Sequence, residues 1–277
     1  MSLSALPSAT SARSALAEAA ARFGFSATPR LDAELLLAHA LGIERQALLL
    51  DLDRPVPDGF AALVERRAAH EPVAYITGSR GFWTIDVDVA PGVLIPRADS
   101  ETLIEAAVDH FAGTSGPARI LDLGTGSGAL LLAALDQWPR ASGVGIDRSP
   151  EALRIAAGNA RRLAPGRAVM RNGGWTGTGE AFDLVLCNPP YVAGVAALSQ
   201  EVAGYEPAAA LFAGADGLDD YRCIAPLLRP QIAPGGVAMI EIGYDQGCTA
   251  AALFREAGFA VTVRRDLGGN DRVLVVT

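Results

Sequence analysis

A glycine-rich loop between a strand pattern and a helix pattern limits what this chain can fold into more than any other feature. Residues Arg119–Leu123 form the short apolar run expected of a buried strand, and residues 129–135 are apolar enough for a buried helix. The loop between them consists of Gly124, Thr125, Gly126, Ser127 and Gly128. Glycine tolerates positive φ and lets the backbone approach a ligand closely. This order indicates a Rossmann-like unit, although the G-x-G-x-G spacing differs from the G-x-G-x-x-G of dinucleotide enzymes.

Strand and helix patterns keep alternating through residues 98–277, which predicts an α/β domain with a parallel sheet. Besides Arg119–Leu123, strand patterns occupy residues 143–146, 168–170, 182–187, 237–241, 260–264 and 273–276. The last two are separated only by residues 265–272, which is too short for a crossover helix. We therefore expect a mostly parallel seven-stranded sheet with an antiparallel carboxyl-terminal hairpin at its edge.

The amino-terminal part of the chain predicts a separate, small helical domain. Apolar residues at helical spacing mark one amphipathic helix around Leu31 and Leu35 and another over residues 60–69. Residues 84–89 alternate like a strand and indicate a hairpin. The expected division is a helical domain, a bridging hairpin with its linker, and the larger α/β domain, which occupy residues 1–78, 79–97 and 98–277.

Composition excludes several classes of protein. Half of the residues are hydrophobic and 19% are charged, so the chain is not disordered, and no apolar run reaches the ~18 residues of a membrane span. The 3 cysteines are too few and too scattered for a disulfide framework or a zinc site, so we expect no metal. The net charge of -8 argues against broad binding to nucleic acid. Residues 1–17 loosely resemble a transit peptide, but helical patterning from Ala12 favours the frayed start of a helix in a cytoplasmic protein.

A second motif, Asn188-Pro189-Pro190-Tyr191, follows the strand pattern at residues 182–187. It stands where an open α/β sheet binds its ligands, at the carboxyl end of a strand. An –NH2 group needs two acceptors in its own plane. The Asn188 side chain and the Pro189 carbonyl oxygen can supply them, while Tyr191 stacks on the flat face. The motif suits an amide or an exocyclic amine, and a plain proline-rich turn is the alternative.

Three further residues are ambiguous when each is taken alone. Asp147 follows the glycine loop by about twenty residues, where an acid receives ribose hydroxyls or is simply solvated. Asp122 either orients the glycine loop or contacts a cationic amino-acid group. Trp175 lies in an Asn-Gly-Gly-Trp loop and either stacks on an adenine ring or covers the core. Together with the glycine loop and the amine-holding tetrapeptide, these residues fit the chemistry of S-adenosylmethionine.

Longer motifs run through nearly the whole chain. They are EPVAYITG at residues 71–78, FW at 82–83, LIPRADSE at 94–101, DLGTGSG at 122–128, NPPY at 188–191, YEP at 205–207 and GADGL at 214–218. With them the chain resembles the peptide chain release factor glutamine N5-methyltransferase family. The Ile-Pro-Arg segment in combination with Asn-Pro-Pro-Tyr is the specific part of the resemblance, because glycine loops of this kind are common to many methyltransferases.

The resemblance implies a class I methyltransferase fold and a role for each matched residue. S-adenosylmethionine would be the cofactor and S-adenosylhomocysteine the product, with residues 124–128 around the methionine part. Asp147 would accept the ribose hydroxyls, Trp175 would border the adenine, and Asn188 would touch both cofactor and substrate. Residues 188–191 would hold the substrate, which is the glutamine of the Gly-Gly-Gln loop in peptide chain release factors.

The chemistry of the acceptor suggests a mechanism. An amide nitrogen is a weak nucleophile because its lone pair is delocalised into the carbonyl group. Our hypothesis is that two in-plane hydrogen bonds, to Asn188 and Pro189, fix the –NH2 group while Tyr191 faces the sulfonium cation. Much of the acceleration then comes from positioning, which provides up to ~7–11 kcal/mol. Arg97 and Glu101, near a helix start, either shape the pocket floor or form a structural ion pair.

Two departures from the family pattern and three other functions stay open. Gly174 stands where the family often has an acid, and Gly204 where an arginine can occur. The same motifs would serve a glutamine methyltransferase acting on a ribosomal protein or an adenine N6-methyltransferase acting on nucleic acid. The acidic charge argues against the latter, and the retained glycine loop argues against a non-catalytic binding module. We expect release factors as partners, with no direct binding to nucleic acid or membranes.

Overall fold

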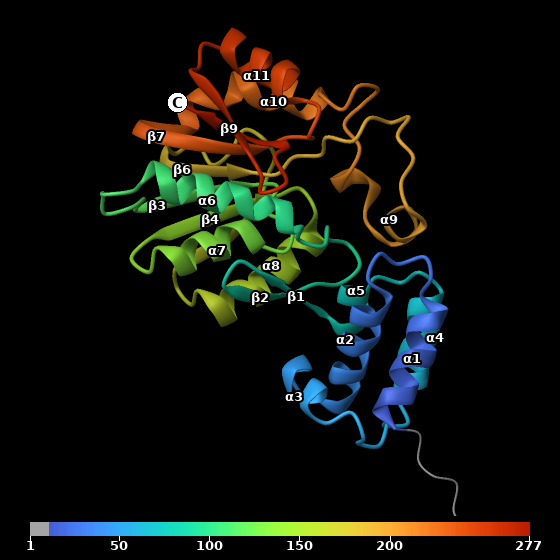
Figure 1. The fold of residues 1–277 in the computed structure, drawn as a ribbon. Helices are drawn as coiled ribbons and strands as arrows, with labels where there is room; N and C mark the ends of the chain where they lie inside the picture. Colours follow the sequence, from blue (N-terminus) through green and yellow to red (C-terminus); the bar gives the residue numbers. More distant parts are fainter. Residues whose placement is uncertain (1–10) are drawn as a thin grey trace, which may run out of the picture. The chain divides into compact units, whose positions relative to one another are not determined.

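The computed structural model describes residues 11–277 and divides the chain into two compact units (Figure 1). The first unit extends to Gly78 and also contains Ser199–Tyr205. The second unit comprises Ser79–Leu198 and Glu206–Thr277. Within the described residues, no helix is long and apolar enough to cross a lipid bilayer.

Short helices around a small apolar core make up the first unit. These helices are α1 (Ala12–Arg22), α2 (Pro29–Leu41), α3 (Arg45–Leu50), α4 (Phe60–Ala68), α5 (Val73–Thr77) and α9 (Gln200–Tyr205). Helix α1 begins after Ser11, whose side chain accepts a hydrogen bond from the Ser14 N–H as an N-cap does. The expected frayed or transit segment before α1 lies outside the described residues. The core consists mainly of Leu16, Phe23, Leu36, Leu37 and Leu48.

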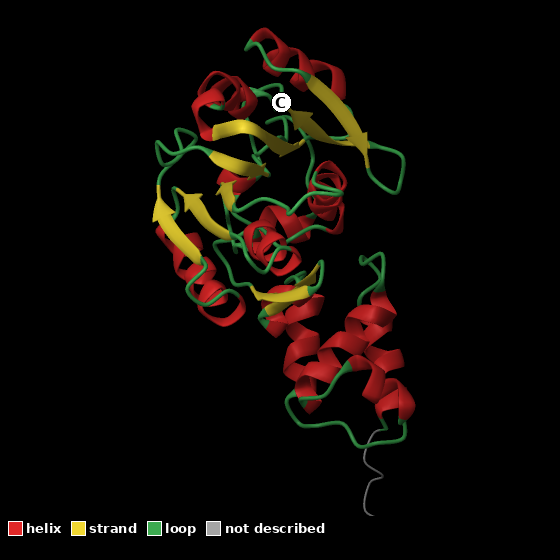
Figure 2. Cartoon of the chain, turned by 90° about the vertical axis from the view of Figure 1, so that its left-hand side faces the viewer, coloured by secondary structure: helices red, strands yellow, loops and turns green. Residues whose placement is uncertain are grey.

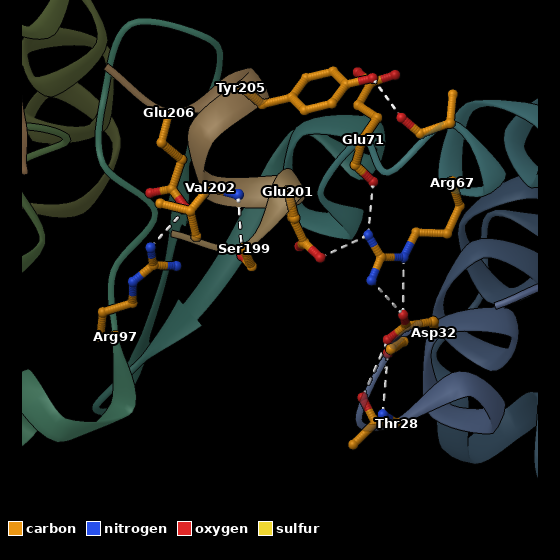
Figure 3. A network of polar contacts seen from close by, with 12 residues as sticks. Thr28, Asp32, Arg67, Glu71, Arg97, Ser199, Glu201, Val202, Tyr205 and Glu206 are labelled. Carbon is orange, nitrogen blue, oxygen red and sulfur yellow. Dashed lines mark hydrogen bonds and ion pairs between the residues drawn. The ribbon is translucent and has the colours of Figure 1, made fainter. Parts of the chain in front are cut away.

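One buried arginine joins helix α9 to the other helices of this unit. Arg67 of α4 is 3% exposed, and its guanidinium donates to Asp32 of α2 and to Glu201 of α9, both at 2.9 Å (Figure 3). The Tyr205 hydroxyl at the end of α9 donates to the carbonyl oxygen of Ala69 at 2.9 Å. The sequence analysis did not assign α9 to the amino-terminal helices, because this segment follows the Asn-Pro-Pro-Tyr motif in the chain.

A seven-stranded sheet is the centre of the second unit, and its strands are drawn in yellow in Figure 2. The strands of this sheet lie in the order β5-β4-β3-β6-β7-β9-β8. Its strands are β3 (Arg119–Leu123), β4 (Ser142–Asp147), β5 (Ala168–Asn172), β6 (Phe182–Cys187), β7 (Ile232–Glu241), β8 (Val261–Arg265) and β9 (Asp271–Val276). Strands β3 to β7 pair in parallel, and β9 pairs antiparallel with both β7 and β8. The predicted mostly parallel sheet with an antiparallel carboxyl-terminal hairpin is confirmed, and β8 forms the edge. Strand β7 begins before the predicted residues 237–241, because its first residues include Pro234 and two glycines that hide the apolar pattern.

Helices on the sheet complete an apolar core. They are α6 (Glu101–His110), α7 (Ala129–Gln137), α8 (Pro150–Leu163), α10 (Asp219–Leu227) and α11 (Gly247–Glu256), with 3₁₀ turns η1 (Ala98–Ser100), η2 (Ala208–Ala210) and η3 (Arg229–Gln231). Helix α7 packs on β3 and β4, α8 on β4 and β5, and α11 on β8 and β9. Fully buried side chains such as Leu121, Val185, Tyr221 and Phe254 fill the space between these layers.

The predicted hairpin forms from β1 (Ser79–Phe82) and β2 (Ile85–Asp88) and belongs to the second unit. A fully buried amide, Asn159 of α8, holds it there. The Asn159 Oδ1 accepts from the Asp88 N–H at 2.8 Å, and its Nδ2 donates to the carbonyl oxygens of Asp88 and Ser127, both at 2.9 Å. Because Ser127 belongs to the glycine loop, one side chain ties the hairpin, α8 and the loop together.

Candidate active site

A cavity of about 340 Å³ opens at the carboxyl ends of β3, β4 and β6. Parallel strands bring the loops that follow them to the same edge of the sheet, which is where open α/β sheets bind ligands. Of the predicted site residues, the wall includes Gly124, Thr125, Gly126, Ser127, Asp147, Trp175, Asn188 and Pro190. The other three, Gly128, Pro189 and Tyr191, are not part of the wall.

Main-chain hydrogen bonds and left-handed glycines shape the glycine loop. The N–H groups of Gly124 and Thr125 both donate to the carbonyl oxygen of Ile146 at 2.9 Å, which fastens the loop to the end of β4. Gly124, Gly126 and Gly128 have φ angles of 73°, 55° and 86°, which residues with side chains rarely adopt. Gly128 directly precedes α7, so it sets the path of the chain into the helix and does not line the cavity.

Asp122 orients this loop from within the core. The side chain is fully buried in β3 and accepts the Thr125 hydroxyl at 2.6 Å. Burial raises the pKa of Asp122 to about 7, although the hydrogen bond from Thr125 lowers it. Its other oxygen, Oδ1, has no hydrogen-bond partner among the described residues, and the side chain does not reach the cavity wall. Of the two roles left open by the sequence, the geometry supports orientation of the loop.

The Asp147 carboxylate lines the cavity at the end of β4. Its Oδ2 accepts the Gly126 N–H at 2.9 Å, and its Oδ1 accepts the Ser149 N–H at 2.8 Å. These bonds hold the carboxylate in place, and each oxygen keeps a lone pair for a hydroxyl group of a ligand. Arg148 and Ser149 line the cavity as well, and the sequence analysis missed both because neither belongs to a recognisable motif.

Trp175 stands beside the glycine loop. Its indole Nε1 donates to Asp220 of α10 at 2.9 Å, and its carbonyl oxygen accepts from the Gln231 side chain at 2.8 Å. A Cβ atom at Gly124 would lie 3.3 Å from the Cη2 atom of the ring, a tight contact at a position whose φ of 73° already favours glycine. The ring packs against the apolar core and also lines the cavity, so the two roles left open in the sequence are compatible. At the neighbouring Gly174, a side chain would meet open space.

Asn188 lines the cavity just after the end of β6. Its Nδ2 donates to the Ser100 Oγ at 3.1 Å. Ser100, at the end of η1, is 3% exposed and lines the cavity, and nothing in the sequence singled it out beyond its place in the Ile-Pro-Arg segment. Since Ser100 engages the –NH2 group of Asn188, the amide oxygen Oδ1 is left for a ligand.

The Tyr191 hydroxyl is held by a buried carboxyl group. It donates to the Oε1 of Glu241, which ends β7, at 3.2 Å. The ring packs against the apolar core and is not part of the cavity wall, so stacking of Tyr191 on a substrate stays a prediction. Burial and the neighbouring Glu241 raise the pKa of Tyr191 well above its ordinary value. Burial also raises the pKa of Glu241 to about 7.

The ion pair of Arg97 differs from the alternative that the sequence suggested. Arg97 donates to the Oε1 of Glu206 at 2.6 Å (Figure 3), and the Ile95 N–H donates to the Oε2 of Glu206 at 3.2 Å. Glu101 instead accepts the main-chain N–H of Trp83 at 2.9 Å. The predicted alternative of an ion pair between Arg97 and Glu101 is therefore wrong. Glu206 is 7% exposed and ties together two segments that both contribute to the cavity wall.

The comparisons with known proteins agree with this geometry. Residues 14–78 match the family model of the PrmC N-terminal domain, and residues 115–240 match a methyltransferase domain. The release factor glutamine methyltransferase of Rhodospirillum rubrum is 44% identical over 256 residues, which are 89% of this chain and 78% of that protein. The protein of the same name from Xylella fastidiosa strain Temecula1 is 44% identical over 254 residues, with 89% and 92% coverage.

The chain belongs to the release factor glutamine methyltransferase family. A solved methyltransferase from Pyrococcus furiosus shares the fold with a TM-score of 0.52 at 18% identity, and the match covers 69% of this chain and 88% of that one. Two motifs that carried the resemblance to the family, Ile-Pro-Arg and Tyr-Glu-Pro, meet in the ion pair of Arg97 and Glu206. Within residues 11–277, no group of His, Cys, Asp and Glu side chains is arranged to hold a metal ion.

Proposed function

We propose that this chain methylates the side-chain amide nitrogen of the glutamine in the Gly-Gly-Gln loop of a peptide chain release factor. Its methyl donor is S-adenosylmethionine, and the second product is S-adenosylhomocysteine. The family membership supports the reaction and the class of substrate. The observation that carries the proposal is the Asn188 amide in the cavity wall, whose –NH2 group is engaged by Ser100 at 3.1 Å. Its Oδ1 is thereby directed to accept a hydrogen bond from a substrate.

The cavity fits the proposed cofactor in size and in chemistry. Its volume of about 340 Å³ lies within the range of small-molecule sites. Residues 124–128 provide a close backbone surface, Asp147 a fixed carboxylate for ribose hydroxyls, and Trp175 a flat ring for the adenine. When bound, S-adenosylmethionine supplies a methyl group made electrophilic by its sulfonium sulfur.

The chain's contribution to the reaction is to orient the acceptor amide. A primary amide has two N–H groups in one plane, and each needs an acceptor. Asn188 Oδ1 and the Pro189 carbonyl oxygen take these positions in the proposal, so that the amide nitrogen is held in one orientation. Correct placement of this kind provides up to ~7–11 kcal/mol of a reaction barrier. None of the described residues that line the cavity is a histidine. In the proposal, the extra proton passes to water after the transfer.

The test is the transfer of a labelled methyl group from S-adenosylmethionine to a purified release factor. Label should reach the factor with an intact Gly-Gly-Gln loop and should disappear when its glutamine is replaced by alanine. We expect Asn188→Ala to lower kcat about 10²–10³-fold, as is typical for loss of one positioned hydrogen-bonding group. Calorimetry with S-adenosylhomocysteine measures cofactor binding in the same variant. Label on the factor without its glutamine, on a ribosomal protein or on an oligonucleotide would contradict the proposal.

A further inference from the structure

One buried carboxyl group lies near both ends of the Asn-Pro-Pro-Tyr motif. At the end of the motif, the Tyr191 hydroxyl donates directly to the Oε1 of Glu241 at 3.2 Å. At its start, Asn188 donates to the Ser100 Oγ at 3.1 Å. Ser100 also contributes to lowering the pKa of the Glu241 carboxyl group, so its hydroxyl lies near that group. Glu241 itself is 1% exposed and does not line the cavity, so it acts on a substrate only through these neighbours.

The direction in which Ser100 donates its hydroxyl proton decides how the Asn188 amide is oriented. A serine hydroxyl has one proton to donate and two lone pairs to accept with. If that proton is donated to an ionised Glu241, Ser100 can only accept from Asn188. The –NH2 group of Asn188 must then face Ser100, and its Oδ1 must face the cavity. If Glu241 is protonated, it can donate to Ser100, whose own proton is then free to turn toward Asn188.

We propose that Ser100 and Glu241 are positioning residues that hold the Asn188 amide with its oxygen toward the substrate. This inference rests on the proposed function, since it explains how the acceptor for the substrate amide is kept in one orientation. The Glu241 Oε2 has no hydrogen-bond partner at full bonding geometry among the described residues. A proton can be added to that atom. Ser100 would then no longer be restricted to accepting a hydrogen bond from Asn188.

The surroundings of Glu241 allow its charge to change near neutral pH. Burial raises the pKa of Glu241 to about 7, while Ser100, Arg272 and Tyr191 lower it. The titratable or charged groups facing Glu241 from the elements around it are Cys187 of β6, Tyr191, Tyr221 of α10, Asp99 of η1 and Arg272 of β9.

Arg272, whose charge lowers the pKa of Glu241, is paired with two other carboxylates. Arg272 forms ion pairs with Asp266 at 3.1 Å and with Asp99 at 3.2 Å. Its charge therefore stabilises the Glu241 carboxylate only in part, and protonation of Glu241 leaves no new unpaired cation behind.

The first measurement follows the Asn188 side-chain –NH2 signals in ¹H–¹⁵N spectra of the protein without cofactor or substrate. The signals are assigned by their loss in Asn188→Asp. We expect them to shift with pH around a midpoint of about 7. Glu241→Gln and Ser100→Ala should abolish this shift, whereas Ser100→Thr, which keeps the hydroxyl, should retain it.

Two variants serve as matched controls for this titration. Asp122→Asn removes the other buried carboxyl group whose pKa is raised to about 7, and that group is not hydrogen-bonded to the motif. Tyr221→Phe removes a buried hydroxyl that donates to the main-chain oxygen of Glu241 at 3.0 Å and not to its carboxyl group. Both variants should keep the pH-dependent shift of the Asn188 signals.

The second measurement is the pH profile of methyl transfer to the release factor. Only the ionised Glu241 accepts the Ser100 proton and so keeps the Asn188 oxygen facing the substrate. Wild-type kcat should therefore rise as pH increases through about 7. Ser100→Ala and Glu241→Gln should lower kcat up to about 10²-fold, as a misplaced reacting group does, with the KM for cofactor little changed. Ser100→Thr should recover most of the activity.

The outcomes separate this inference from the proposed function. If wild-type protein transfers no methyl group to a release factor, the proposed function fails, and the spectra still test the orientation of Asn188. If wild type turns over and Glu241→Gln keeps both the pH-dependent Asn188 signals and normal kcat, the inference is wrong. Loss of the signals' pH dependence in Asp122→Asn would also overturn it, because a different carboxyl group would then be responsible.

Discussion

The two units bury charged groups in opposite ways. In the helical unit, the Arg67 side chain is 4% exposed and binds two carboxylates, Asp32 and Glu201, and the carbonyl oxygen of Glu71. In the α/β unit, Glu241 is 1% exposed and has an oxygen with no hydrogen-bond partner among the described residues. Arg272, whose charge lowers the pKa of Glu241, is paired with Asp266. Asp122 is similar, with one free oxygen in the described structure.

This difference separates a structural role from a responsive one. A buried charge that is fully paired holds its partners in one arrangement, and removing it leaves those partners buried and uncompensated. A buried carboxyl group that is incompletely paired instead acquires a pKa near neutrality, so its charge depends on conditions. Arg67 therefore keeps α9 with the other helices of the first unit, whereas Glu241 can change the hydrogen bonds of the adjacent site.

The largest effect is expected from removing the fully paired charge. Arg67→Ala leaves Asp32 and Glu201 without their shared cation, which should destabilise the helical unit by about 3–5 kcal/mol. Hydrogen exchange followed by mass spectrometry on peptides from α2, α4 and α9 measures this loss. Tryptophan fluorescence reports the α/β unit separately, because all 3 tryptophans lie there, and its unfolding midpoint should stay unchanged.

The neighbouring arginine provides a matched control. Arg66 pairs with Glu71 at 2.5 Å, but its side chain is 44% exposed. Arg66→Ala should therefore cost less than ~1 kcal/mol, as exposed ion pairs do. Equal effects of the two substitutions would show that complete pairing of a buried charge is not what holds α9 in this unit.

The next effect is a pH dependence of opposite sign to that of ordinary paired carboxylates. The pKa of Asp122 rises from 3.8 and that of Glu241 from 4.5, each to about 7 in the folded protein. Between these values the folded state binds more protons than the unfolded state, so the free energy of unfolding falls as pH rises from about 4 to about 7. We compare the free energy of unfolding of each variant, Asp122→Asn and Glu241→Gln, with that of wild type. This difference should shift in favour of the variant by on the order of 1–4 kcal/mol between pH 5 and pH 8.

Urea unfolding followed by tryptophan fluorescence at several pH values measures this trend. Asp216 is the contrasting case, because hydrogen bonds from Arg222 lower its pKa to about 2. Its contribution is present above about pH 4 and is lost only as pH falls toward 2, outside the window of the two buried groups. If the free energy of unfolding differs between wild type and each variant by the same amount at pH 5 and at pH 8, the comparison is contradicted.

A smaller effect is expected at an ion pair of intermediate burial. The Arg97 side chain is 36% exposed and that of Glu206 only 1%. Arg97→Met leaves Glu206 with the Ile95 N–H as a partner, so the cost should be limited to about 1–2 kcal/mol. Because Glu206 ties together two wall segments, S-adenosylhomocysteine should bind several-fold more weakly by calorimetry.

An exposed pair in the same unit is the control for this substitution. Arg171 and Glu180 form an ion pair with side-chain exposures of 49% and 43%. Arg171→Met should change neither stability nor binding measurably. If Arg97→Met binds S-adenosylhomocysteine like wild type, the ion pair does not support the cavity wall.

Local patterns in the sequence were sufficient for much of the fold. Apolar runs predicted strands β3 and β6 at their observed bounds, and the short segment of residues 265–272 predicted the antiparallel hairpin. These predictions succeed because the pattern of apolar side chains that marks a strand is complete within a few consecutive residues. The glycine loop and the Asn-Pro-Pro-Tyr motif are local patterns of the same kind, and residues of both line the candidate cavity.

Pairings between distant residues were decided only by the tertiary structure. Arg97 stands four residues from Glu101 in the chain yet pairs with Glu206, and Arg67 reaches Glu201. Ser100 and Glu241, which the sequence analysis did not consider, meet around Asn188 and Tyr191 through the order of strands in the sheet. The sequence determines which segments are strands, turns and helices because those preferences are local. Which charges share a buried space depends on how the segments pack, and that packing sets both their partners and their pKa values.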